Sequence, residues 1–133
     1  MHASLWSMSD FKKLSVWHKA HALAMDVDRV IGGIRGNRHS SLRHQACRAA
    51  DSVGSNIVEG AGEQTNANFS RFVRIAINST NELEHHLIVA TDRKVISPTD
   101  SLTLKSQVVE VRMMLYGLRR YLDSHPDSDE EAG

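Results

Sequence analysis

Residues 97–122 read SPTDSLTLKSQVVEVRMMLYGLRRYL, and this stretch decides the fold class. Its apolar residues recur at alternating steps of four and three, the spacing of a helix that buries one seam. They are Leu104, Val108, Val111, Leu115, Leu118 and Leu122. Ser97 suits the N-cap of such a helix, and Pro98 suits its first position. Asp100 places a negative charge near the unpaired amides of the first turn. The stretch therefore predicts one long amphipathic helix.

Three further segments have the same helical period: residues 15–34, 40–59 and 68–92. Glycines follow the first two of them, which marks their ends. No strand-like alternation of useful length is found. Four amphipathic helices joined by short loops bury their apolar stripes best against one another. The sequence predicts an all-α fold, an antiparallel up-down four-helix bundle.

Length and composition fit one domain, because the chain has 133 residues, of which 41% are hydrophobic and 24% charged. No apolar run approaches the ~20 residues that span a bilayer, and no secretory signal is visible. We therefore expect a cytoplasmic protein with no membrane association. A single cysteine, Cys47, excludes an internal disulfide and a thiolate zinc cluster.

The net charge of zero hides an asymmetry along the chain. Residues 123–133 hold five acids and no lysine or arginine, which leaves 16 basic against 11 acidic residues elsewhere. The body is therefore about +5. We expect residues 1–10 to be a flexible N-terminal segment, 11–122 the bundle and 123–133 an acidic disordered tail.

Catalytic and metal sites are not indicated. His18 and His21 share a helix face but lack a third ligand, and the Glu82 to His85 spacing of a di-iron bundle occurs once instead of twice. Cys47 is best read as a packed thiol. We expect no enzymatic activity, no catalytic residue, no metal and no cofactor.

Basic residues form three groups that are candidates for contact with nucleic-acid phosphates. The alternative, that they only solvate helix exteriors, stays open. No aromatic residues alternate with them, which argues against base stacking. The candidates are Arg35, Arg38 and Arg43 around the first loop, Arg71 and Arg74 on the third helix, and Lys105, Arg112 and Arg119 on the fourth.

A polar motif also lies within the helices. We expect its carboxylates to accept hydrogen bonds from an adjacent helix end or to pair with Arg48, a structural role; acid–base chemistry would lack a nucleophile. The motif comprises Asn56, Glu59, Gly60, Glu82 and Glu84.

Three segments carry a family resemblance: FKKLSVWHKAHAL at 11–23, QACRAADSVGSNIVEG at 45–60 and FSRFVRIAINSTNELEHHLIVA at 69–90. The order and spacing of their residues resemble the bacterial four-helix-bundle proteins encoded in 23S rRNA intervening sequences. The accessory variability proteins of diversity-generating retroelements share that fold group. The loop after the first helix departs from the family pattern, since it is rich in glycine and arginine. The neutral net charge departs from the retroelement accessory proteins, which tend to be strongly basic.

The resemblance implies a cyclic homopentamer without enzymatic activity. For the retroelement members it also implies binding of RNA or DNA and of a reverse transcriptase. We therefore expect a self-assembling accessory or scaffold protein that binds nucleic acid through basic strips. The alternative is a protein–protein interaction module with no nucleic-acid role. Apolar residues on more than one face of segment 15–34 predict that this helix supplies the subunit interface.

Overall fold

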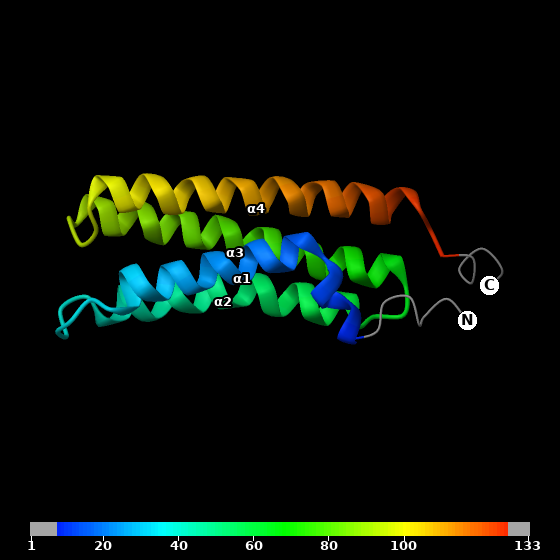
Figure 1. Ribbon diagram of the computed structural model, residues 1–133, viewed down its shortest axis with the longest axis horizontal. Coiled ribbons are helices and arrows are strands. Elements are labelled where there is room, and N and C mark those ends of the chain that lie inside the picture. Colours follow the sequence, from blue (N-terminus) through cyan, green and yellow to red (C-terminus); the bar gives the residue numbers. More distant parts are fainter. Residues whose placement is uncertain (1–7, 128–133) are drawn as a thin grey trace.

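A computed structural model describes residues 8–127, which form four long helices side by side (Figure 1). A short 3₁₀ helix, η2 (Met8–Lys13), precedes α1 (Ser15–Val27) and a π-helical turn, η3 (Asp28–Gly32). Then follow α2 (Ser40–Ala61), α3 (Asn66–Asp92) and α4 (Pro98–Ser124). No strand occurs between residues 8 and 127, so the expected all-α class with four helices is confirmed.

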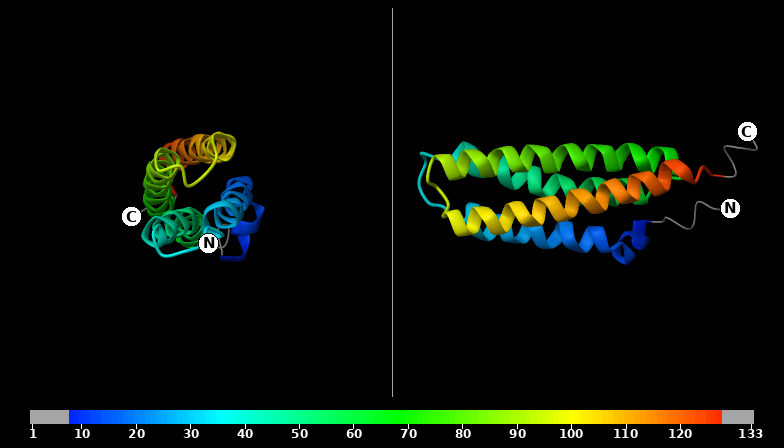
Figure 2. Two further views of the ribbon diagram at one scale, coloured as in Figure 1. Left: turned by 90° about the vertical axis from the view of Figure 1, so that its left-hand side faces the viewer. Right: turned by 90° about the horizontal axis from the view of Figure 1, so that it is seen from above.

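Successive helices run in opposite directions and surround one apolar core (Figure 2). Each helix contacts the two next to it around the bundle, and α2 lies diagonally opposite α4. The seam expected on the fourth helix is buried at Leu104, Val108, Val111, Leu115 and Leu122. Ser97 caps α4 by accepting a hydrogen bond from the amide of Asp100 at 3.0 Å, as the sequence predicts.

The first predicted helix differs from its expected form. Segment 15–34 is expected as one helix, whereas the α-helix ends at Val27 and continues as the π-helical turn to Gly32. A Cβ on Gly32 would lie 2.7 Å from the Asp28 carboxylate oxygen, so glycine permits that close approach. The wider turn keeps Ile31 fully buried.

The expected domain boundaries need correction at both ends. Residues 123–127 are not a disordered tail: α4 extends through Ser124, and Asp127 is buried at the start of α3. Its carboxylate accepts a hydrogen bond from the Asn66 amide, and Ser70 donates to Asp123 at 2.5 Å. At the other end, residues 8–10 belong to η2. The rest of the expected terminal segments, 1–7 and 128–133, lies outside the described residues.

Within residues 8–127, no helix combines the length and the apolar character needed to cross a membrane.

Candidate interaction surfaces

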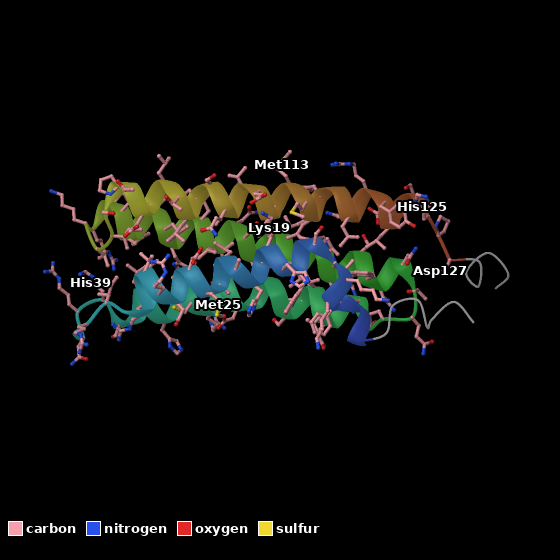
Figure 3. All side chains as sticks on the ribbon, in the orientation of Figure 1. Lys19, Met25, His39, Met113, His125 and Asp127 are labelled. Carbon is pink, nitrogen blue, oxygen red and sulfur yellow. The ribbon has the colours of Figure 1, made fainter. Side chains whose placement is uncertain are left out.

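An unpartnered apolar stripe runs along the outer face of α4. Its members recur at steps of seven, four and three, so they share one face of the helix. We call them the α4 ridge: Leu102, Val109, Met113 and Tyr116. Met113 is 65% exposed and points away from the other helices (Figure 3). Periodicity alone does not show that this stripe is the exposed one, because the core seam two positions away has the same period.

Part of the apolar surface expected on the first helix is buried inside the bundle. Val16, Leu23 and Ala24 are all buried within the bundle, because α2 and α4 cover two faces of α1. The expected exposure is therefore wrong for these three residues, whereas Trp17 and Val30 stay partly exposed. That this helix supplies a subunit interface stays a prediction. Met25, which is 51% exposed, remains as an outward apolar residue of α1.

A groove of ≈ 220 Å³ lies between α1 and α2 on the outside of the bundle. Small side chains form its floor, and Trp17 stands at one end with Met25 at the other. Trp17 is held by His21, whose ring stacks on it with centroids 5.1 Å apart. We call this feature the α1–α2 groove: Trp17, Ala20, Ala24 and Met25 from α1, Ala50, Gly54 and Val58 from α2, and His21, Asp51 and Ser55 at its rim.

Three of the candidate phosphate-binding residues form ion pairs or hydrogen bonds within the chain. Arg112 forms an ion pair with Glu84 at 2.7 Å and donates to Asn81 at 3.0 Å. Arg119 pairs with Asp123 at 3.7 Å. Arg43 donates to the carbonyl oxygens of Ile34 at 2.6 Å and Gly36 at 3.3 Å, so it fixes the first loop. The expected strip of Lys105, Arg112 and Arg119 is thus largely neutralised by intramolecular pairs.

Of the five other candidates, Lys105 lies on α4, and the remaining four form two groups near opposite ends of the bundle. Arg35 and Arg38 lie in the loop 33–39, which is at the same end of the bundle as the loop 93–97 (Figure 1). That second loop adds Arg93 and Lys94, and neither loop contains an acid. We call these four cations the basic end. Arg71 and Arg74, both exposed, lie about 30 Å away along α3.

Arg93 and Lys94 are not among the residues that the sequence singles out, because they stand alone in the third loop. Only the up-down topology, which places the first and third loops at the same end, puts them at the end of the bundle that holds Arg35 and Arg38. The sequence does contain a pattern that could have identified the basic end, since both loops are short, basic and free of acids.

Part of the polar motif makes contacts between α2 and α3. Ser52 and Ser79 share a hydrogen bond of 2.8 Å across the two helices. Asn56 donates to the Ser52 carbonyl at 2.8 Å and to its hydroxyl at 3.0 Å, so it holds this bridge in place. Glu82 lies 3.5 Å from His86, and Gly60 lets Phe69 approach α2.

Glu59 does not fill the structural role expected of it. Its side chain is exposed, and among residues 8–127 it forms no hydrogen bond or ion pair. Arg48, the expected partner of the carboxylates, instead donates to Gln45 at 3.5 Å. The polar motif is therefore not one connected network in the single chain.

Cys47 lies half-buried beside a pocket of ≈ 530 Å³ at the start of α2, which Asp28, Arg43 and His44 also line. Burial raises the pKa of the Cys47 thiol, and the charges of Asp28 and Asp51 raise it further against the opposing effect of Arg43. The thiol is accordingly protonated at neutral pH, a form that is a poor nucleophile. Among the described residues no cluster of three or more metal-ligating side chains occurs.

Comparison with known proteins gives a family and a fold. The sequence pattern of the 23S rRNA-intervening sequence protein family matches residues 12–117. A solved structure of a protein of unknown function from the S23 ribosomal protein family, from Bacteroides thetaiotaomicron VPI-5482, superimposes with a TM-score of 0.72 at 20% identity. That match covers 80% of this chain and 96% of the other. No curated protein matches the chain.

Proposed function

The chain belongs to the 23S rRNA-intervening sequence protein family, and from this premise we propose that it is a non-enzymatic scaffold or accessory protein that acts by assembling with copies of itself. The observation that carries the proposal is the α4 ridge. The core of the bundle is already complete without these side chains. They are nevertheless long, apolar and aligned along one helix.

Exposed apolar stripes of this kind mark protein interfaces more often than free surface. Methionine and tyrosine suit such a role, since both are enriched in interface cores. The proposed state is the cyclic homopentamer that the family resemblance implies. Neither the α4 ridge nor the composition determines the number of subunits. A reverse transcriptase, the partner implied by the retroelement proteins of the fold group, remains a prediction.

Light scattering at micromolar concentration after size exclusion tests self-assembly. The chain has a mass of 14.8 kDa, so a pentamer gives about 74 kDa, five times that value. Any stable closed oligomer would support self-assembly and revise only the subunit count. A mass of one chain at this concentration would contradict the proposal.

Nucleic-acid binding is a second candidate function, and the basic end favours it. Four cations from two loops lie at that end and no ion pair is found for them in the described chain, whereas the α4 strip is neutralised by Glu84 and Asp123. Arginine and lysine clustered in this way attract phosphates without reading bases. A ring in which all bundles point the same way would repeat the basic end on one face.

A further inference from the structure

Two apolar surfaces of the bundle have no partner within residues 8–127: the α4 ridge and the α1–α2 groove. They lie on different sides, because α4 is diagonal to α2 (Figure 2). We propose that the α4 ridge of one copy docks into the α1–α2 groove of the next copy. This inference rests on the self-assembly proposed above and names the two surfaces that meet.

The two surfaces are complementary in shape. The groove runs from Trp17 to Met25, eight residues or about 12 Å of helix, so it takes up part of the ridge, which measures about 21 Å from Leu102 to Tyr116. The floor of the groove consists of small residues, which let a neighbouring helix come close. Met113 is the most exposed residue in the middle of the ridge, and its flexible side chain adapts to an irregular groove.

Charges beside the two surfaces are complementary. Asp51 stands at the rim of the groove and forms no ion pair with any cation of the described chain. Lys105, next to the ridge and one turn before Val109, is likewise without an acidic partner between residues 8 and 127. Each would gain an opposite charge at the same interface.

The direction of the helices brings these two charges together. In the up-down bundle α2 and α4 run the same way, so in a ring of bundles that all point alike, α4 of one copy runs parallel to α2 of the next. With Val109 over Gly54 and Met113 over Val58, Lys105 lies over Ala50 of the neighbouring copy. Its side chain is then next to Asp51 of that copy.

A ridge that enters a groove makes a heterologous interface. Each copy in an open chain still offers one free ridge and one free groove, and closure into a ring satisfies both. A ridge-to-ridge contact would instead stop at a dimer and leave the groove unused. Mixing two defective variants distinguishes these arrangements.

The experiment uses Met113→Asp, which places a charge on the ridge, and Gly54→Leu, which fills the groove. Met113 is 65% exposed, and the first atom added at Gly54 meets only Trp17 Nε1 at 3.8 Å, so both chains keep the bundle fold. Each variant alone is expected to lose the assembly. Mixed in equal amounts, they are expected to form a heterodimer of two chains, joined by the intact ridge of one and the intact groove of the other. Ile88→Asp on α3 and Gly54→Ala are the matched controls and should assemble as the wild type does.

The possible outcomes separate the interface from self-assembly. A wild-type chain that stays monomeric would contradict the proposed self-assembly itself. Assembly that survives both Met113→Asp and Gly54→Leu would overturn this interface while self-assembly stands. Loss of assembly without a heterodimer in the mixture, when circular dichroism shows both variants helical, would overturn the ridge-to-groove arrangement.

A charge exchange gives a second test that leaves the apolar surfaces intact. Asp51→Lys and Lys105→Asp should each weaken association about tenfold or more by placing like charges at the interface. The double variant should recover most of the affinity. Two additive decreases without recovery would contradict the proposed pairing of Asp51 with Lys105.

Discussion

At the scale of single residues, the polar motif divides into positions with different roles. Asn56 is tied to Ser52, while Glu59 faces solvent without a partner in the described chain. The sequence predicts that polar groups sit within α2 and α3, since residue types and spacing give that directly. It cannot predict which of them turn inward, because a rotation of one residue, about 100° around a helix, decides between burial and exposure.

Gly60 is the position where α2 and α3 approach most tightly. A Cβ there would lie 2.7 Å from Phe69 Cδ1 and 3.0 Å from Phe72 Cβ. Gly60→Ala should therefore lower the free energy of unfolding by about 1–3 kcal/mol through overpacking, measured by urea denaturation. Gly117→Ala is the control, since the added Cβ would meet only Arg120 at 3.8 Å. Replacing glycine inside a helix should raise the free energy of unfolding by up to ~1 kcal/mol. Equal effects at both glycines would refute the packing argument.

Cys47 should react slowly with alkylating reagents. Because burial and then the charges of Asp28 and Asp51 raise its pKa, less thiolate is present at any pH below that raised value than in an ordinary cysteine. Iodoacetamide at pH 8 should modify the native chain more slowly than the chain in denaturing urea, and Asp51→Asn should speed the native reaction. Because the pKa of Cys47 is raised, the native alkylation rate should keep rising with pH beyond 9.0, the ordinary thiol pKa. A native rate equal to the denatured rate would contradict this environment.

At the scale of elements, the strongest periodic segments are predicted closely by the sequence. The fourth helix follows from its seam and its Ser-Pro start, and both are found. The π-helical turn is not predictable in this way, because its extra residue follows from how Ile31 and Gly32 pack against the bundle. The same limitation hides the α4 ridge: periodicity shows two apolar stripes on α4, and only packing shows which stripe the other helices cover.

The end of α4 and the start of α3 stabilise each other. Asp127 accepts a hydrogen bond from the first amide of α3 and is 9% exposed. The acidic sequence around it predicts a disordered tail instead. Asp127→Ala should cost about 0.5–2 kcal/mol, as the removal of other helix caps does, measured by thermal or urea unfolding. Asp127→Asn keeps an acceptor oxygen and should be much less destabilised. An Ala variant as stable as the wild type would show that this hydrogen bond does not stabilise the bundle.

At the scale of the whole molecule, positive charge is concentrated where the topology places two loops at one end of the bundle. The basic end comprises cations from residues 35–38 and 93–94, which no local sequence pattern connects. The sequence predicts three basic strips of similar standing. The structure leaves Lys105 beside the α4 ridge and pairs Arg112 and Arg119 with acids.

If the chain binds RNA or DNA, the basic end should dominate. Replacing Arg35, Arg38, Arg93 and Lys94 with alanine should weaken binding more than Arg71→Ala with Arg74→Ala. The slope of log K against log salt should flatten by about 0.7 for each single-strand phosphate that the variant no longer binds, or about 0.9 for duplex. Gel shift or anisotropy from ~50 mM salt upward measures this, with Arg48→Ala as a control outside the basic end. Equal weakening in both multiple variants would contradict a site at the basic end, and absence of wild-type binding would leave self-assembly as the function.

The central claim is that this protein works by assembling through an apolar surface on α4. The most direct measurement is the solution mass of Met113→Asp beside that of Ile88→Asp, by light scattering at one micromolar-range concentration. Both substitutions put a carboxylate on an exposed apolar site, at 65% and 42% exposure, and only the first lies on the α4 ridge. We predict a single chain of 14.8 kDa for Met113→Asp and the wild-type oligomer for Ile88→Asp. A Met113→Asp chain that keeps the wild-type oligomeric mass would contradict the claim.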